Sequence, residues 1–198
     1  MDVAVIKLGV GNTASVMFAL ERVGANATLT NDPTQVRDAA RVILPGVGAA
    51  AAAMRLLNQS GMAEVLRTFA RPLLGICLGQ QVLYDRSEEG SAAGLGLLPG
   101  TVAALEATPQ RPAPHMGWSA LRIEQHHALL EGVRSGDYAY FVHSYACPAD
   151  ANAIAQAEYG AVFAAAVARD NVFGCQFHPE RSGAVGARIL RNFLALPC

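Results

Sequence analysis

A cysteine flanked by glycines, in Gly75-Ile76-Cys77-Leu78-Gly79, is the residue of this chain best placed to act as a nucleophile. The apolar run Pro72–Ile76 predicts a strand before it, and Leu78–Tyr84 predicts a helix after it. A nucleophile between glycines at such a junction is typical of a tight elbow, where a Cβ atom on either side would collide. The N-terminus of the following helix favours the thiolate, which is the nucleophilic form. Taken alone, the pattern also fits a small buried cysteine packed beside glycines.

A histidine and a glutamate stand two residues apart in Phe177-His178-Pro179-Glu180, after Val172–Phe177, which predicts the last strand. In extended backbone this spacing turns both side chains the same way, and Pro179 disfavours helical geometry at His178. A carboxylate beside imidazole fixes its tautomer and supports the imidazolium formed during proton transfer. A lone His-Pro-Glu is more often a strand-end turn. Together with Cys77, it predicts a Cys-His-acid site for nucleophilic catalysis at the carboxyl ends of parallel strands.

A glycine-rich turn, Pro45-Gly46-Val47-Gly48, follows another predicted strand. Its backbone freedom allows N–H groups to point at a developing oxyanion, together with the N–H of Leu78. We therefore expect Val47, Gly48 and Leu78 to form an oxyanion hole. Without Cys77 nearby, the same residues would be an ordinary glycine-rich turn.

Strands and helices alternate through the first half of the chain, the pattern of a mainly parallel sheet covered by helices on both faces. The expected strands are Val3–Leu8, Ala27–Leu29, Arg41–Leu44 and Pro72–Ile76, and the expected helices are Val16–Val23, Pro33–Ala40, Ala49–Leu57, Met62–Phe69 and Leu78–Tyr84.

Beyond Ser91 strands predominate, which predicts antiparallel additions to the sheet. They are expected at Thr101–Leu105, Trp118–Ile123, Tyr138–Tyr145, Ala151–Ala157 and Val162–Val167, and the chain closes with a helix at Gly183–Leu196.

Composition narrows the functional classes. The 198 residues fit one domain. Hydrophobic residues make up 52% of the chain and charged residues 16%, a composition that excludes a disordered chain. Fifteen Lys and Arg against sixteen Asp and Glu, without a basic stripe, speak against a nucleic-acid partner. The apolar run Val42–Met54 is broken by Pro45 and is shorter than the ~20 residues of a membrane span, so no membrane partner is expected. Met1-Asp2 leads directly into an apolar strand without a signal peptide, which predicts a cytoplasmic protein.

Residue spacing also gives no support for a metal or a cofactor. The adjacent pair His126-His127 cannot turn two rings to one side of regular backbone, and Gly9-Val10-Gly11 lacks the third glycine of a dinucleotide fingerprint. Cys147, Cys175 and Cys198 have neither elbow nor base, so we expect packing roles for them.

These motifs, in this order from Val3 to Leu194, resemble the class I (triad-type) glutamine amidotransferases, and among them the glutaminase subunits of imidazole glycerol phosphate synthase. The more specific segments are Pro114-His115-Met116-Gly117-Trp118 and Phe141-Val142-His143-Ser144-Tyr145. Others are residues 41–49, Ser87-Glu88-Glu89-Gly90, residues 94–100, Ala168-Arg169-Asp170-Asn171 and Gln176–Gly183. The resemblance implies one glutamine amidotransferase domain over residues 1–198. Its fold would be α/β and flavodoxin-like, a mainly parallel sheet flanked by helices with an antiparallel extension.

The resemblance also implies an activity. Cys77 would attack the carboxamide of L-glutamine, His178 would protonate the departing ammonia, Glu180 would orient His178, and no cofactor would be needed. Ammonia would pass to a (β/α)8-barrel cyclase partner that makes imidazole glycerol phosphate and aminoimidazole carboxamide ribotide, for histidine and purine synthesis. The residues implied to bind glutamine are Gln81, Glu89, Ser144 and Tyr145, and those implied at the partner interface are Asn12, Trp118, Tyr140 and Arg181.

Two alternatives stay open, and the chain departs from the family at one place. It could be the glutaminase component of another synthase, such as anthranilate or pyridoxal phosphate synthase, although Pro114–Trp118 argues against both. It could also be a non-catalytic regulatory subunit, which the intact triad disfavours. The family usually has Asp-Tyr-Gly-x-Gly-Asn after the first strand, whereas this chain has Lys7-Leu8-Gly9-Val10-Gly11-Asn12, close to the expected interface.

Overall fold

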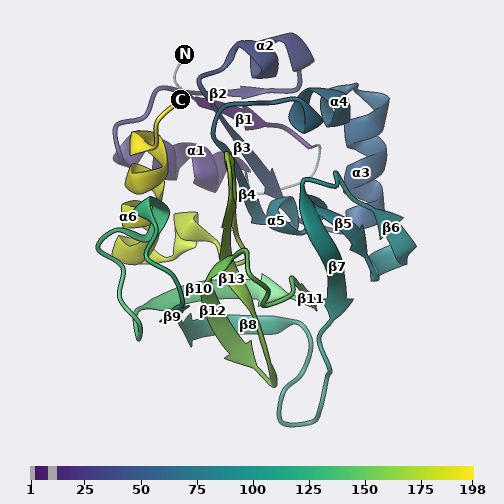
Figure 1. Cartoon of the computed structure of the whole chain (residues 1–198), viewed down its shortest axis with the longest axis vertical. Helices are drawn as coiled ribbons and strands as arrows, with labels where there is room; N and C mark the ends of the chain where they lie inside the picture. The colour runs from purple at the N-terminus through teal and green to yellow at the C-terminus, as the bar shows by residue number, and fades with distance from the viewer. Residues whose placement is uncertain (1–2, 9–12) are drawn as a thin grey trace.

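The computed structural model describes residues 3–8 and 13–198, which form an α/β fold around an eight-stranded sheet (Figure 1). The strands are β1 (Val3–Ile6), β2 (Ala27–Thr30), β3 (Arg41–Gly46), β4 (Leu73–Cys77), β5 (Tyr84–Ser87), β6 (Ala92–Ala93), β7 (Leu98–Ala104), β8 (His115–Ala120), β9 (Arg122–Ile123), β10 (Tyr138–His143), β11 (Tyr145–Ala146), β12 (Ala153–Tyr159), β13 (Ala161–Arg169) and β14 (Val172–Cys175). The α-helices are α1 (Thr13–Arg22), α2 (Pro33–Asp38), α3 (Ala50–Gln59), α4 (Met62–Arg67), α5 (Leu78–Val82) and α6 (Gly183–Ala195). Three 3-10 turns are η1 (Glu89–Ser91), η2 (Ala128–Leu130) and η3 (Pro179–Arg181).

The order of the main sheet is β2-β1-β3-β4-β14-β13-β12-β9. The first five strands run parallel, and the last three continue the sheet in antiparallel pairs. This arrangement confirms the predicted parallel sheet with an antiparallel extension. Since β3, β4 and β14 are neighbours, the turns that follow them meet at one edge of the sheet, as expected for an α/β crevice.

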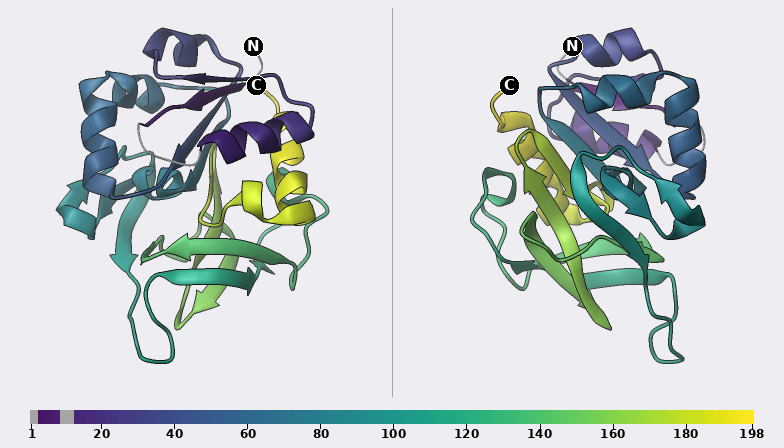
Figure 2. Two further views of the ribbon diagram at one scale, coloured as in Figure 1. Left: turned by 180° about the vertical axis from the view of Figure 1, so that it is seen from behind. Right: turned by 45° about the vertical axis from the view of Figure 1, so that its right-hand side comes forward.

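The parallel strands carry apolar side chains on both faces, and helices cover both faces. Along β1, Val3 and Val5 point to a core shared with α1 and α6, whereas Ala4 and Ile6 point to a core shared with α2, α3, α4 and α5. Figures 1 and 2 show α1 and α6 on one side of the sheet and α3 and α4 on the other. The two apolar cores pack around the strands whose ends carry the candidate site.

The strands expected at residues 118–123 and 138–145 are each divided in two, and the helix predicted after Cys77 ends early. Residues 78–84 were expected to be helical, but α5 ends at Val82 and Tyr84 begins β5. Tyr84 is fully buried and pairs with Leu98 of β7, so long-range pairing of an aromatic residue overrides the local helical pattern. The strands beyond residue 91 also do not all extend the main sheet, because β11-β7-β5-β6 and β10-β8 form separate sheets.

The two-stranded sheet of β8 and β10, called the ribbon below, has a buried and an exposed face. Strand alternation places His115, Phe141 and His143 inside. The other face carries exposed apolar side chains, with relative exposures of 64% for Met116, 54% for Trp118 and 58% for Tyr138. An exposed apolar group of this kind is typical of a protein interaction surface.

None of the helices in the described part of the chain is long and apolar enough to cross a membrane.

Candidate active site

Cys77 ends β4 and immediately precedes α5, as the elbow pattern predicts. Its backbone has φ 55° and ψ −111°, a conformation that residues with a Cβ rarely adopt. Strain of this kind persists only where the surroundings enforce it, and it is common at functional sites. The elbow turns Cys77 out of the strand direction and into the cavity described below.

The glycines of the elbow are required by close backbone contacts. A Cβ atom on Gly75 would lie 2.5 Å from the carbonyl oxygen of Gly79, and one on Gly79 would lie 1.7 Å from the carbonyl oxygen of Leu44. Leu44 belongs to the neighbouring strand β3, so α5 begins pressed against the sheet. The elbow therefore has no room for side chains on these two residues.

We expect Gly79→Ala to lower the free energy of unfolding by about 3 kcal/mol, because the Leu44 carbonyl belongs to a buried strand and has nowhere to move. Gly24→Ala is a matched control: Gly24 has φ +81° but nothing within 4 Å of its Cβ position. It should cost only about 1–2 kcal/mol of backbone strain. Denaturant unfolding of both variants measures the difference, and equal losses would show that the contact with Leu44 relaxes.

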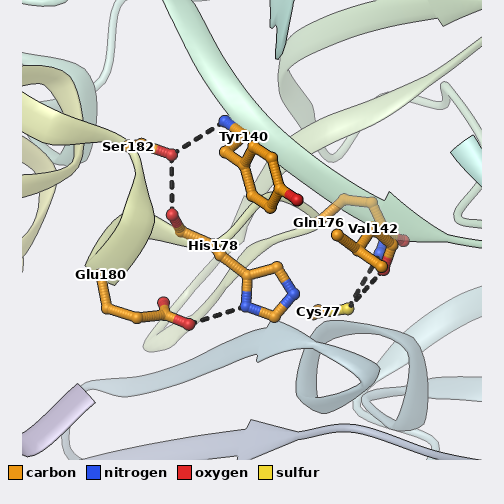
Figure 3. Close-up of polar contacts among 7 residues, drawn as sticks. All are labelled: Cys77, Tyr140, Val142, Gln176, His178, Glu180 and Ser182. Carbon is orange, nitrogen blue, oxygen red and sulfur yellow. Dashed lines mark hydrogen bonds and ion pairs between the residues drawn. The ribbon is translucent and has the colours of Figure 1, made fainter. Parts of the chain in front are cut away.

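His178 and Glu180 form a buried pair beyond the end of β14. The Nδ1 atom of His178 lies 2.7 Å from Oε1 of Glu180, and both side chains are largely shielded from solvent. Figure 3 shows the sulfur of Cys77 on the side of the imidazole away from Glu180. The structure thus brings the three sequence-predicted catalytic residues together in the order sulfur, imidazole, carboxylate.

The surroundings keep His178 protonated. Burial alone would lower the pKa of its imidazole, but hydrogen bonding and charge interactions with Cys77 and Glu180 outweigh burial and raise the pKa to about 10. His178 therefore carries a proton at neutral pH. A protonated imidazole beside a sulfur nucleophile is suited to protonate a leaving group.

A second histidine at the cavity, His143, behaves in the opposite way. Burial lowers the pKa of His143 to about 4, and it also lowers the pKa of its neighbour His115. The two rings share a hydrogen bond of 3.1 Å between Nδ1 of His115 and Nε2 of His143, and Nδ1 of His143 donates to the carbonyl of Tyr145 at 2.8 Å. His143 is thus a neutral support of the backbone, which leaves the acid role to His178.

A buried glutamine contacts the sulfur of Cys77. Gln176 lies with its Nε2 3.8 Å from the Cys77 sulfur, and its Oε1 accepts a 3.1 Å hydrogen bond from Nε2 of Gln81. The same Nε2 of Gln81 donates to the carbonyl of Tyr145 at 2.8 Å. On the other side, the sulfur hydrogen-bonds to the carbonyl of Val142 at 3.6 Å. The nucleophile is therefore held between β10 and the Gln176-Gln81 pair.

A cavity of about 240 Å³ opens over the nucleophile. It unites nine of the residues that the sequence singled out for catalysis, the oxyanion hole or glutamine: Val47, Gly48, Cys77, Leu78, Gln81, Glu89, Ser144, Tyr145 and His178. Glu180 supports His178 from behind. The volume and the mixed lining fit a small polar metabolite.

Glu89 is anchored next to the turn predicted as the oxyanion hole. Its Oε2 accepts a 2.6 Å hydrogen bond from the N–H of Ala50, the first residue of α3. That helix has no side-chain cap of its own, so Glu89 supplies the missing acceptor. The carboxylate thus places negative charge at the wall of the cavity, where it can bind a cationic group.

Sequence reasoning missed several residues of the site. Val142, His143 and Pro114 also line the cavity, Gln176 contacts the sulfur, and Ser182 bonds to the backbone of His178. All of them stand in segments that carry the family resemblance, namely Pro114–Trp118, Phe141–Tyr145 and Gln176–Gly183. The resemblance marked these segments but gave these particular residues no role.

The residues implied at the partner interface are separated from the cavity. Trp118 and Tyr140 are paired across the ribbon and their rings meet edge to face at 5.8 Å, while Arg181 is exposed in η3. Asn12 and most of the unusual loop lie outside the described residues. The apolar outer face of the ribbon and Arg181 are available to a partner.

The remaining cysteines differ from the expectation in one respect. Cys147 and Cys175 are buried, and burial raises the pKa of the Cys147 thiol to about 12 and that of Cys175 further above its usual range. Cys198 is exposed rather than packed, although its sulfur hydrogen-bonds to the carbonyl of Ala40 at 3.5 Å. Among residues 3–8 and 13–198, no group of three or more His, Cys, Asp or Glu side chains gathers as metal ligands.

Comparison with known proteins places this geometry in a family. The profile of the family "Glutamine amidotransferase class-I" matches residues 4–196. The chain is 49% identical over 195 residues to the "Imidazole glycerol phosphate synthase subunit HisH" of Xanthomonas axonopodis pv. citri, covering 98% of both chains. It is 46% identical over 194 residues to the "Imidazole glycerol phosphate synthase subunit HisH 2" of Legionella pneumophila strain Paris, again covering 98% of both.

Solved structures share the fold. One titled "Crystal structure of glutamine amidotransferase" has a TM-score of 0.77 at 21% identity, with 98% of this chain and 97% of that chain covered. "Structure of PurLQS from Thermotoga maritima" has a TM-score of 0.72 at 21% identity with the same coverage. The full-length matches and the elbow geometry agree, and the chain belongs to the class-I glutamine amidotransferase family.

Proposed function

We propose that the chain is the glutaminase subunit of an imidazole glycerol phosphate synthase. The observation that carries the proposal is the cavity in which Cys77 meets the His178-Glu180 pair, in a chain whose relatives are named as subunits of that synthase. The substrate is L-glutamine, and the products are glutamate and ammonia. Because Cys77 must remain a free thiol, we also infer that the protein works in the cytoplasm, where thiols stay reduced.

The reaction proceeds in two stages. The proton of the Cys77 thiol passes to His178, which gives a thiolate beside an imidazolium. The thiolate attacks the carboxamide carbon of glutamine, and the tetrahedral intermediate collapses when His178 donates that proton to the departing nitrogen. Ammonia leaves and a thioester remains on the sulfur. Water, deprotonated by the now neutral His178, then cleaves the thioester to give glutamate and the starting enzyme. Glu180 holds His178 in the required tautomer throughout.

Backbone and polar groups around the cavity bind the substrate. The N–H groups of Val47 or Gly48 and of Leu78 receive the oxyanion, and each such donor is typically worth ~3 kcal/mol of the barrier. The carboxylate of Glu89 binds the α-amino group, Gln81 lines the amide end, and the backbone of Ser144 and Tyr145 meets the α-carboxylate. This assignment is supported by the position of all these residues at one cavity.

The partner is a (β/α)8-barrel cyclase that consumes the ammonia. We propose that it binds the outer face of the ribbon, with Trp118 and Tyr140 as aromatic anchors and Arg181 at the rim. Ammonia would then pass directly to the cyclase rather than into solvent. The exposed apolar side chains of the ribbon support this surface.

Purification of the complex from the native host tests the function. The purified complex should contain a barrel cyclase, release glutamate from glutamine, and form imidazole glycerol phosphate from its nucleotide substrate. Trp118→Ala should weaken the association about tenfold or more without altering the fold of the isolated chain. A complex with a different synthase, or one without glutamate release, would contradict the proposal.

Within the triad, we expect loss of Glu180 to be milder than loss of His178. Water can partly replace an orienting carboxylate, whereas nothing else at the cavity can deliver the proton. Glu180→Gln should keep measurable glutamate release, and His178→Ala should lose it. A more damaging Glu180→Gln would show that the assigned roles are wrong.

The same pair predicts a pH dependence of stability. Since the pKa of His178 is raised from 6.5 to about 10 in the folded chain, its contribution to stability is complete below pH 6.5 and is lost as the pH rises toward 10. Glu180→Gln removes one cause of the raised pKa, so the variant should lose less stability between pH 7 and 10. Unfolding in denaturant between pH 7 and 10 measures the stability of both proteins, and NMR titration of the imidazole measures the pKa of His178. An NMR pKa near 6.5 in the unmodified chain would contradict the expectation.

A further inference from the structure

Ser182 stands at the N-cap position of α6, yet its hydroxyl does not cap the helix. Serine at this position ordinarily accepts a hydrogen bond from an N–H of the first turn and stabilises the helix by doing so. Here the hydroxyl instead donates to the carbonyl of His178 at 2.7 Å and accepts from the N–H of Tyr140 at 3.0 Å (Figure 3). The side chain therefore links η3 to β10 and leaves the N-terminus of α6 without a side-chain cap.

A third hydrogen bond closes the contact. The N–H of His178 donates to the carbonyl of Tyr140 at 2.9 Å, so both backbone polar groups of Tyr140 point to the His178 turn. Ser182 is only 2% exposed, which shields these bonds from competing water. From the other side, the carbonyl of Pro179 lies against Gly186 of α6, where a Cβ atom would come within 1.9 Å. The turn that carries His178 is thus clamped between β10 and α6.

Strand β10 also holds the nucleophile. Val142, two residues beyond Tyr140, is the residue whose carbonyl contacts the sulfur of Cys77 at 3.6 Å. One strand therefore positions both reacting groups: His178 through Tyr140 and Ser182, and Cys77 through Val142. Two residues of extended strand span only about 7 Å, so a small displacement of the turn along β10 changes the distance between imidazole and sulfur directly.

We propose that Ser182 is a positioning residue, which sets His178 against Cys77 by fastening the His178 turn to β10. The inference rests on the proposed glutaminase function. Ser182 does not line the cavity, so it acts on the rate of the chemical step and leaves glutamine binding unchanged.

The test compares Ser182→Ala with Ser182→Thr, which retains a hydroxyl, and with Ser60→Ala. Ser60 is a matched control, since its hydroxyl donates to the carbonyl four residues earlier, Leu56, at 2.9 Å, as that of Ser182 does to His178. In the complex with the partner, Ser182→Ala should lower kcat for glutamate release about 10- to 100-fold with KM within about twofold, because small misplacement of a catalytic group costs rates of this order. Ser182→Thr should recover most of the loss, and Ser60→Ala should match the unmodified chain.

Two further measurements separate positioning from a loss of stability, and both use the isolated chain. NMR titration of His178 should show its pKa reduced in Ser182→Ala, since the imidazole no longer faces Cys77 squarely. The rate of Cys77 alkylation by iodoacetamide should fall as well, measured in a Cys198→Ser background to remove the exposed thiol. A lower kcat with an unaltered His178 pKa and alkylation rate would overturn the proposal, as would an unchanged kcat.

The design also covers a variant that does not fold. If Ser182→Ala is unfolded, Ser182→Cys replaces it, because cysteine has similar volume but is a weak hydrogen-bond donor. The proposal is supported if Ser182→Cys has a lower kcat than the unmodified chain and a reduced His178 pKa. It is overturned if the two chains have the same kcat. The titration and alkylation need neither glutamine nor partner. A chain without glutaminase activity would therefore refute the proposed function while Ser182 is still tested.

Discussion

Replacing Cys77 by alanine is expected to reduce glutamate release by the complex at least about 10⁴-fold, because the attacking atom of a covalent mechanism is removed. The other cysteines cannot substitute. Cys147 and Cys175 are buried with raised pKa values, and the exposed Cys198 has its sulfur at the carbonyl of Ala40, outside the cavity. Alanine tolerates the φ of 55° at this position no worse than cysteine does, so the fold and partner binding should remain nearly intact. Glutamate release at saturating glutamine measures the loss.

Labelling provides the complementary result. An alkylating analogue of glutamine should modify Cys77 alone among the four cysteines, and free glutamine should protect it. Cys198→Ser is the matched control, because it removes the other accessible thiol and should leave both turnover and labelling unchanged. Surviving turnover in Cys77→Ala, or equal labelling of Cys147 or Cys175, would show that Cys77 is not the nucleophile.

The sequence was sufficient for the parts of the site that are encoded locally. The elbow depends on glycines two residues on either side of Cys77, and the His178-Glu180 contact spans two residues, so spacing alone predicted both. The parallel sheet could also be predicted from the sequence, because only a few sheet topologies are compatible with buried strands that alternate with helices. These features require no knowledge of distant contacts.

The parts that failed depend on pairing between distant segments. Tyr84 was expected in a helix because its neighbours have a helical pattern, and only pairing with β7 makes it a strand residue. Likewise, the local pattern around Val142 and Ser182 does not indicate that β10 lies beside both Cys77 and His178, although the family resemblance placed the nearby Ser144 and Tyr145 at the glutamine site. The ribbon has an exposed apolar face and a buried pair of histidines. Which residues lie on which face can be predicted from strand alternation only when the pairing of β8 with β10 is known.

The isolated subunit is expected to be nearly idle, and to become an efficient glutaminase only with its partner and the partner's nucleotide ligand present. Val47 and Gly48 follow Gly46, the last residue of β3 paired to β4, so their peptide is not fixed by the sheet. Val47 is 43% exposed, and a Cβ atom on Gly48 would meet nothing within 4 Å. Glycines on both sides of Val47 lower the cost of rotating this peptide. We therefore expect its N–H to point away from the oxyanion site at rest and toward it in the engaged complex.

The expected stimulation is ~100-fold or more, because one oxyanion donor is typically worth ~3 kcal/mol. Only a ligand that binds better to the engaged state can shift the equilibrium, so the partner's ligand should increase the rate in the complex and have no effect on the isolated chain. Glutamate release by the chain alone, by the complex, and by the complex with ligand measures the three states. Equal rates in all three would contradict a rotating peptide and would point to the Lys7-Leu8 loop as a place where coupling has been lost.

Gly48→Ala tests the rotation itself. Gly48 has φ +97°, which alanine adopts only with strain, so the substitution drives the peptide away from this conformation in every state of the complex. The ratio between the rates with and without ligand should therefore shrink markedly, whichever orientation the variant prefers. Gly24→Ala carries the same kind of strain at φ +81°, after α1 and away from the cavity, and should keep the full ratio. If Gly48→Ala keeps the full ratio too, the stimulation does not arise from rotation of this peptide.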